Sequence, residues 1–165
     1  MIMVVDILNK KTGRLCKATV TKVRLKDFDK ISKDRFNTFN WQDFKLSYRG
    51  LFKLMKGGEI LGLMQFGIEN PFQNVMELTK IELSKENIGQ NKRYDYVAGC
   101  LIAFACFKTI KYTKRDMGIY YTKSTKRIYL EKYGMTPYDQ YYVKSDKDNS
   151  ISLIKKYLNI DCQVA

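Results

Sequence analysis

Histidine is absent from this sequence of 165 residues. Catalytic triads and dyads that use an imidazole, and zinc sites with histidine ligands, are therefore excluded, and we expect no bound metal. The four cysteines form no C-x-x-C pair, so they are expected to be reduced thiols. No apolar run approaches the roughly 20 residues that span a bilayer, and the apolar start, residues 1–5, is too short for a signal peptide. We therefore expect a cytoplasmic protein without a membrane segment.

The composition is rich in apolar residues and has more basic than acidic residues. The hydrophobic share of 45% and the aromatic share of 13% are typical of a chain that folds by itself, and the length fits a single domain over residues 1–165. Thirty Lys and Arg against seventeen Asp and Glu leave a net charge of +13. This excess has two interpretations. It can reflect AT-rich coding, or it can serve a polyanionic ligand or partner such as a phosphorylated cofactor, an acidic protein or nucleic acid.

Hydrophobic periodicity and turn residues predict an α+β chain. Extended segments are expected at residues 2–8, 18–25, 51–55, 60–68, 75–84, 118–122 and 135–143. Helices are expected at residues 97–112, 124–133 and 151–158, and residues 26–43 fit one or two short helices or an aromatic-anchored loop. Gly57-Gly58 would turn a hairpin, and the turn at 9–13 another. Ser124 and Gly134 would cap the second helix at its two ends.

The strand, loop and helix between residues 75 and 112 carry the clearest functional signal. A helix start exposes unpaired backbone N–H groups and the positive end of the helix dipole, which bind phosphate readily. Lys92 and Arg93 stand just before this start, and Gly99 lets a ligand approach closely. The alternative is an ordinary strand-to-helix connection in which Asp95 caps the helix and the basic residues face solvent.

Two local motifs resemble the GNAT superfamily of acetyl-CoA-dependent N-acetyltransferases. The segment Arg93-Tyr-Asp-Tyr-Val-Ala98 looks like the pyrophosphate loop of that family, with Tyr96 where the first glycine is expected. The segment Ile128-Tyr-Leu-Glu-Lys-Tyr-Gly-Met135 is similar to the Tyr-x-x-x-Gly-Phe segment beside the thioester, although Tyr129 lies five residues before the glycine. The resemblance covers about residues 51–143. It implies a mixed, mostly antiparallel sheet flanked by helices.

The resemblance also implies a function and the residues that perform it. The chain would transfer an acetyl group from acetyl-CoA to an amine on an acidic or polyanionic acceptor. Glu77 would be the base, with Glu82 in reserve, and Tyr129 the acid that protonates the CoA thiolate. The two glutamates lie five apart, so on a regular strand they would point to opposite faces. The implied cofactor-binding residues are Leu83, Ser84, Lys92, Arg93, Tyr94, Tyr96, Val97, Ala98 and Gly99.

A different class of function stays open. A non-catalytic, basic module with the same fold would bind nucleic acid or an acidic protein. Tyrosines beside basic residues are suited to stack bases and contact phosphates. These residues are Tyr120, Tyr121, Tyr138, Tyr141, Tyr142, Lys123, Lys126, Arg127 and Lys144. The other interpretation is plain β-sheet tyrosine beside a solvated charged surface.

Overall fold

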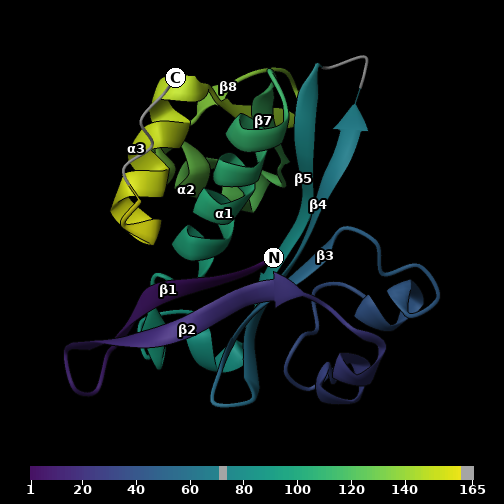
Figure 1. The fold of residues 1–165 in the computed structure, drawn as a ribbon, viewed down its shortest axis with the longest axis vertical. Helices are drawn as coiled ribbons and strands as arrows, with labels where there is room; N and C mark the ends of the chain where they lie inside the picture. Colours follow the sequence, from purple (N-terminus) through teal and green to yellow (C-terminus); the bar gives the residue numbers. More distant parts are fainter. Residues whose placement is uncertain (71–73, 161–165) are drawn as a thin grey trace. The chain divides into compact units, whose positions relative to one another are not determined.

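The computed structural model describes residues 1–70 and 74–160, and only the backbone of residues 68–70. Within these residues the chain folds into a nine-stranded mixed sheet with three α-helices (Figure 1). The helices are α1 (Val97–Tyr112), α2 (Lys123–Tyr133) and α3 (Lys147–Leu158). The strands are β1 (Ile2–Asn9), β2 (Arg14–Lys22), β3 (Leu51–Lys56), β4 (Glu59–Asn70), β5 (Val75–Leu83), β6 (Tyr94–Asp95), β7 (Asp116–Tyr120), β8 (Thr136–Pro137) and β9 (Tyr142–Ser145).

The strand order is β6-β1-β2-β3-β4-β5-β7-β9-β8. Pairing is antiparallel between β1 and β2, β2 and β3, and β3 and β4, whereas β5 and β7 run parallel. The chain separates into two compact units. Unit 1 holds residues 1–65 and 80–101, and unit 2 holds residues 66–79 and 102–165. No described helix is long and apolar enough to cross a membrane.

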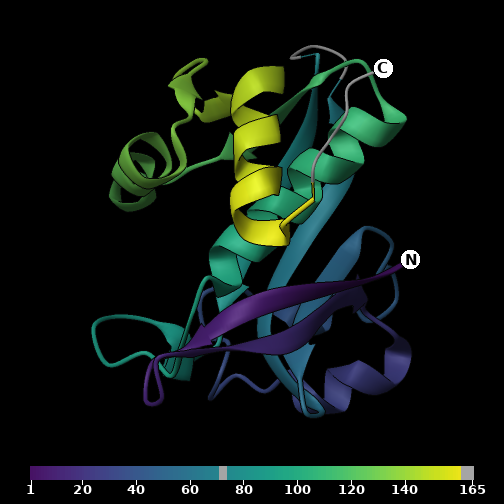
Figure 2. The same ribbon diagram turned by 60° about the vertical axis from the view of Figure 1, so that its left-hand side comes forward.

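Unit 1 begins with a long hairpin of β1 and β2, drawn in purple in Figure 2. The Asn9 side chain closes its turn by accepting hydrogen bonds from the backbone amides of Lys11 and Thr12. The segment between β2 and β3 forms two 3₁₀ helices, η1 (Leu25–Lys30) and η2 (Trp41–Phe44), and thus confirms the expected short helices. Their aromatic side chains explain this compact form, because they join strand residues in one core. Its buried members are Val23, Phe28, Ile31, Phe36, Trp41, Leu51, Ile60 and Leu63.

Unit 2 contains the first residues of β5, strands β7, β9 and β8, and helices α2 and α3 (Figure 2). Residues 102–106 of α1 are buried, which agrees with the apolar character of this helix on all sides. The N-cap of α2 is Thr122, two residues before the expected Ser124. Gly134 ends the helix in a left-handed conformation, as expected, with φ 62°. Pro137 lies in β8, the edge strand, where a missing N–H is tolerated.

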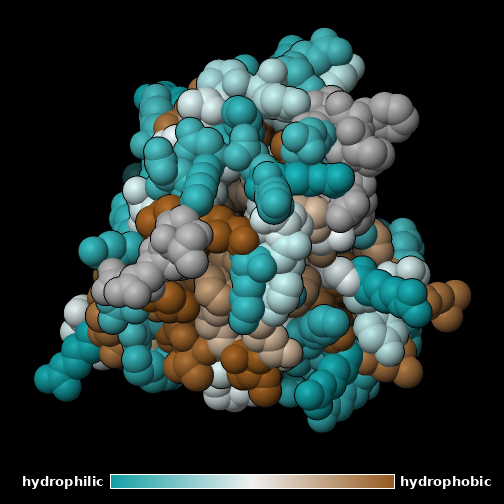
Figure 3. Space-filling model, turned by 45° about the horizontal axis from the view of Figure 1, so that its top comes forward, coloured by the Kyte–Doolittle hydropathy of each residue, from teal (hydrophilic) through white to brown (hydrophobic). Residues whose placement is uncertain are grey.

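Other sequence predictions are confirmed within one or two residues at most ends. The second strand starts four residues earlier than expected, at Arg14, and α3 also starts four residues earlier, at Lys147. Strand β7 starts two residues earlier, at Asp116. The extended segment expected at 135–143 is interrupted, because the Asp139 carboxylate accepts hydrogen bonds from the amides of Tyr141 and Tyr142 and makes a turn. Surface side chains include hydrophobic as well as hydrophilic ones (Figure 3).

Candidate functional site

The loop before α1 holds Tyr96 in a conformation that side chains rarely adopt. Its φ is 73°, in the left-handed region that favours glycine. This is the residue that stands where the pyrophosphate motif has its first glycine. The Asp95 carboxylate accepts a hydrogen bond from the Tyr96 amide at 2.8 Å, and α1 begins at the next residue, Val97. The backbone at this position is therefore one that glycine adopts more readily than tyrosine.

The start of α1 in unit 1 offers the N–H groups that such a turn presents to a phosphate. By helix geometry, the amides of Val97, Ala98 and Gly99 have no acceptor within the helix. Close packing on β4 holds this end in place, because a Cβ on Gly62 would lie 3.1 Å from Val97 Cγ1. The group fits a diphosphate by its donors and by the dipole of a sixteen-residue helix.

Hydrogen bonds fasten the preceding loop to its surroundings in unit 1. Asn87 is the centre of these contacts: its side-chain oxygen accepts from the Tyr94 amide at 3.0 Å, and its Nδ2 donates to Ser84 Oγ at 2.7 Å. Ser84 and Tyr94 are buried. Leu83 lies close to Val97 near the Gly62 backbone. The side chains of Leu83, Ser84 and Tyr94, three of the predicted cofactor-binding residues, are therefore used for packing within the protein. A cofactor would contact their backbone instead.

The two predicted cations of the loop are paired with carboxylates. Lys92 Nζ lies 2.8 Å from Asp95 Oδ1, and Arg93 Nη1 lies 3.0 Å from Glu59 Oε2. The Arg93 side chain keeps 56% of its surface exposed, so it is accessible to an anion. Its pairing with Glu59 connects the loop to β4.

A second arginine, Arg35, was missed by sequence reasoning. Its guanidinium pairs with Glu59 at 2.9 Å and with Glu86 at 3.3 Å, and its backbone oxygen accepts from the Lys85 amide. Burial would raise the pKa of Glu86, but hydrogen bonds, including one from Arg35, and the charge of Arg35 hold it below its usual value. No local pattern indicates this role, because Arg35 and Glu86 are 51 residues apart.

In unit 2 the predicted base, Glu77, has a specific partner. Tyr142 donates its hydroxyl hydrogen to Glu77 Oε1 at 2.7 Å, and the Glu77 residue is only 6% exposed. Tyr142 packs edge to face on Tyr120, with ring centroids 5.6 Å apart. The carboxylate is therefore held in one orientation by a hydroxyl that is itself positioned by packing.

Glu77 lies on a defined face of the unit 2 strands. It pairs with Gly118 of β7, which pairs with Lys144 of β9. The next residue, Ser145, contacts Cys106 of α1 through its hydroxyl. Side chains of neighbouring strand residues alternate between faces, so Glu77 lies on the face away from that part of α1.

Glu82, the reserve base, serves a structural role in unit 1. Its carboxylate accepts three hydrogen bonds, from the Thr38 amide at 2.7 Å, the Phe39 amide at 3.2 Å and Trp41 Nε1 at 2.7 Å. The residue is 5% exposed. It thus anchors the aromatic segment before β3, and its oxygens are occupied by protein donors.

The side chain next to Glu82 shows which face of β5 it occupies within unit 1. Leu83, next to Glu82, points toward α1, since its Cδ2 and Leu101 Cδ1 lie 3.2 and 3.0 Å from where a Gly62 Cβ would be. Glu82 therefore faces away from α1 within unit 1.

The predicted acid, Tyr129, is a buried phenol of α2. It is 7% exposed, and burial raises its pKa to about 12, so it carries its proton at neutral pH. Its ring packs beside Tyr133, with centroids 6.4 Å apart. Among the described residues, no hydrogen bond to its hydroxyl is found. The hydroxyl hydrogen is therefore not committed to an acceptor in the described chain.

Comparison with solved structures identifies the fold. The chain has the fold of the GNAT acetyltransferases, a mixed, mostly antiparallel sheet with helices. The AtaT toxin, solved with the C-terminus of the antitoxin AtaR and acetyl-CoA, matches with a TM-score of 0.56 and 9% identity over 84% of this chain and 98% of that one. No protein-family model matches the sequence, and neither does any curated protein.

Two further structures share the fold at similarly low identity. A GNAT-family acetyltransferase from Bacillus cereus matches with a TM-score of 0.55 and 14% identity, over 79% of this chain and 97% of that one. Naa50 from Arabidopsis thaliana, solved with the bisubstrate analogue CoA-Ac-MVNAL, matches with a TM-score of 0.52 and 12% identity, over 78% and 98%. The likeness is one of fold.

Proposed function

We propose that this protein is an N-acetyltransferase that moves an acetyl group from acetyl-CoA to an amine. The observation that carries the proposal is Tyr96, directly before α1, whose left-handed φ of 73° favours glycine and which stands where the pyrophosphate motif has glycine. A tyrosine in this region costs about 1–2 kcal/mol, which a merely connecting loop would not need. Acetyl-CoA would supply the acetyl group as a thioester.

The cofactor-binding part of the proposal rests on unit 1. Arg93 and Lys92 would meet the phosphates, with the amides of residues 97–99 beside them. Because Glu59 now pairs with Arg93 at 3.0 Å, phosphate binding exchanges one charge-assisted hydrogen bond for another. Leu83, Ser84 and Tyr94 would contribute backbone groups and packing.

The chemical part rests on unit 2. Glu77 would take the proton that the amine loses as its nitrogen bonds to the acetyl carbon, and Tyr142 would keep the carboxylate oriented. Tyr129 would give its proton to the sulfur as the carbon–sulfur bond breaks. Its protonated state at neutral pH suits that role. Glu82, with three donors on its carboxylate, is better suited to hold the segment at 38–41 than to exchange protons.

The acceptor is proposed to be acidic or polyanionic. A net charge of +13 exceeds what the CoA phosphates need for neutralisation. Association with such an acceptor should weaken steeply as salt rises. A second candidate function, a non-catalytic module that binds nucleic acid or an acidic protein, is favoured by the half-exposed tyrosines near Glu77; it would show binding without acetyl transfer to any amine.

Acetyl-CoA binding tests the proposal through Arg93. Acetyl-CoA should raise the melting temperature of the protein by mass action. Arg93→Ala should weaken binding by about 1–3 kcal/mol, as expected for loss of a charge-assisted hydrogen bond. Arg14→Ala, which removes an exposed arginine in the N-terminal hairpin, is the matched control and should bind normally. No thermal shift of the wild-type protein at millimolar acetyl-CoA would contradict the proposal.

A further inference from the structure

Unit 2 gathers exposed tyrosines at one place, the end of β7 and the turn between β8 and β9. Tyr120 and Tyr141 stack with ring centroids 6.3 Å apart and ring planes at 12°. Tyr120, Tyr138 and Tyr141 keep 47%, 41% and 50% of their surface exposed. We call these three residues the tyrosine platform. Each carries a large apolar ring that the fold leaves in contact with water.

Hydrogen bonds hold the turn that carries the tyrosine platform. Tyr121 donates its hydroxyl hydrogen to the Gln140 carbonyl at 2.9 Å, and its amide donates to the Tyr141 carbonyl at 3.0 Å. The Tyr138 amide donates to the Tyr142 carbonyl at 3.0 Å. These bonds hold the backbone of the turn that carries the platform, so little backbone freedom is lost when a ligand binds there.

Two lysines lie near the tyrosine platform. Lys126 Nζ lies 5.0 Å from the ring centroid of the neighbouring Tyr121, and Lys144 Nζ lies 5.5 Å from that of Tyr138 and 3.1 Å from the Asp116 carboxylate. Lys123 and Lys126 also lie in the first turn of α2, where the helix dipole disfavours cations. Both features suit a ligand with negative charges beside flat rings.

We infer that the tyrosine platform, with Lys126 and Lys144, is a binding site for single-stranded nucleic acid. Nucleobases stack on exposed aromatic rings, and the phosphates between them pair with lysines. A duplex buries the faces of its bases, so the rings would have nothing to stack on. An acidic peptide would use the lysines and leave the stacked tyrosine pair without a role.

The site adjoins the proposed base through one residue. Tyr142 contacts Tyr120 of the platform by its ring and Glu77 by its hydroxyl. If the proposed acetyl transfer holds, an amine attached to the bound strand is therefore the acceptor class that this geometry favours. That step rests on the proposed function, whereas binding of the strand does not.

Fluorescence anisotropy with a labelled single-stranded oligonucleotide tests the site in the absence of acetyl-CoA. Tyr120→Leu keeps an apolar side chain but removes the ring, and should weaken binding by about 5- to 150-fold, equivalent to 1–3 kcal/mol for a stacked base. Tyr120→Phe keeps the ring and should bind within about twofold of wild type. Melting temperatures of both variants show whether unit 2 remains folded.

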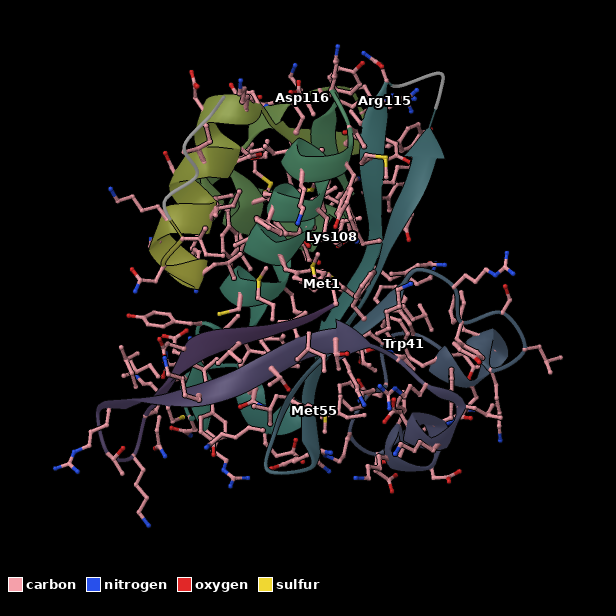
Figure 4. The ribbon with its side chains drawn as sticks, viewed as in Figure 1. Met1, Trp41, Met55, Lys108, Arg115 and Asp116 are labelled. Carbon is pink, nitrogen blue, oxygen red and sulfur yellow. The ribbon has the colours of Figure 1, made fainter. Side chains whose placement is uncertain are left out.

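Tyr112 provides the matched control. It is 56% exposed and lies outside the platform. Its ring centroid lies 4.6 Å from Lys108 Nζ and 5.5 Å from Lys111 Nζ (Lys108 is labelled in Figure 4). Tyr112→Leu should leave the affinity unchanged. Lys126→Gln should reduce the salt dependence of binding by about one phosphate contact.

Several results would overturn the inference. These are no binding at low salt, equal affinity for a duplex, equal losses in Tyr112→Leu and Tyr120→Leu, or binding of polyglutamate that also depends on Tyr120. Wild-type oligonucleotide binding without a thermal shift by acetyl-CoA would sustain the site and contradict only the proposed transferase.

Discussion

Glu82→Gln is expected to destabilise unit 1 because the carboxylate satisfies three donors in a buried position. The Thr38 amide and Trp41 Nε1 each donate at 2.7 Å, and the Phe39 amide at 3.2 Å. A glutamine has one acceptor oxygen, so its NH₂ group would face a donor. Hydrogen bonds to a charged group are worth about 1.5–3 kcal/mol each. Loss of about two predicts a decrease of about 3–6 kcal/mol in the free energy of unfolding.

Urea unfolding followed by far-UV circular dichroism measures this decrease. Trp41 is the sole tryptophan of the chain and is 2% exposed, so its fluorescence reports independently on the same contact. Glu131→Gln is the control, since Glu131 forms an exposed i,i+4 pair with Arg127 and should change stability by less than about 0.5 kcal/mol. A Glu82→Gln protein as stable as this control, with wild-type tryptophan emission, would refute the anchoring role. If turnover were then lost, Glu82 would be the base.

Three other changes test the site and the fold. Glu77→Gln should lower the maximal rate of acetyl transfer by about 10²-fold or more with little change in acetyl-CoA affinity, and Tyr142→Phe should lower that rate less. Full turnover of Glu77→Gln in steady-state kinetics would show that Glu77 is not the base. Burial would raise the pKa of Asp27 and Glu86, but hydrogen bonds and the charges of Lys53 and Arg35 hold both below their usual values. Their stabilisation is therefore complete above about pH 5 and is lost as pH falls through the folded values; urea midpoints that stay constant down to pH 3 would contradict this. Tyr96→Gly should be about 1 kcal/mol more stable than Tyr96→Ala in thermal unfolding, because only glycine is free of the cost of a positive φ, and the reverse order would exclude strain there.

Sequence patterns determined the elements because their causes are local. Alternation and paired glycines predicted the hairpin of β3 and β4, and a continuous apolar run predicted α1. Gly134 ends α2 in the left-handed conformation that its position implied. Comparison with the motif also placed Tyr96 where a glycine is expected, and the observed positive φ is one that glycine favours. Each of these inferences depends on residues within one or two turns of each other.

Local sequence patterns could not predict the strained backbone of Tyr96 or the partners of the charged residues. Arg93 and Arg35 both pair with Glu59, and Lys53 and Asp27 form an ion pair in which both side chains are nearly buried. In Figure 4, Trp41 lies within the segment between β2 and β3 that Glu82 anchors. Such pairs form only when packing brings distant segments together.

The two glutamates show the division most clearly. The sequence by itself determined that Glu77 and Glu82 belong to one strand and that this strand precedes the loop before α1. Tertiary structure alone decided that Glu82 meets Thr38, 44 residues away, and that Glu77 meets Tyr142, 65 residues away. It also decided that Glu82 faces away from α1 within unit 1, since Leu83 beside it points toward that helix. The role of a carboxylate depends on the donors around it, and those donors come from segments that only the folded chain brings together.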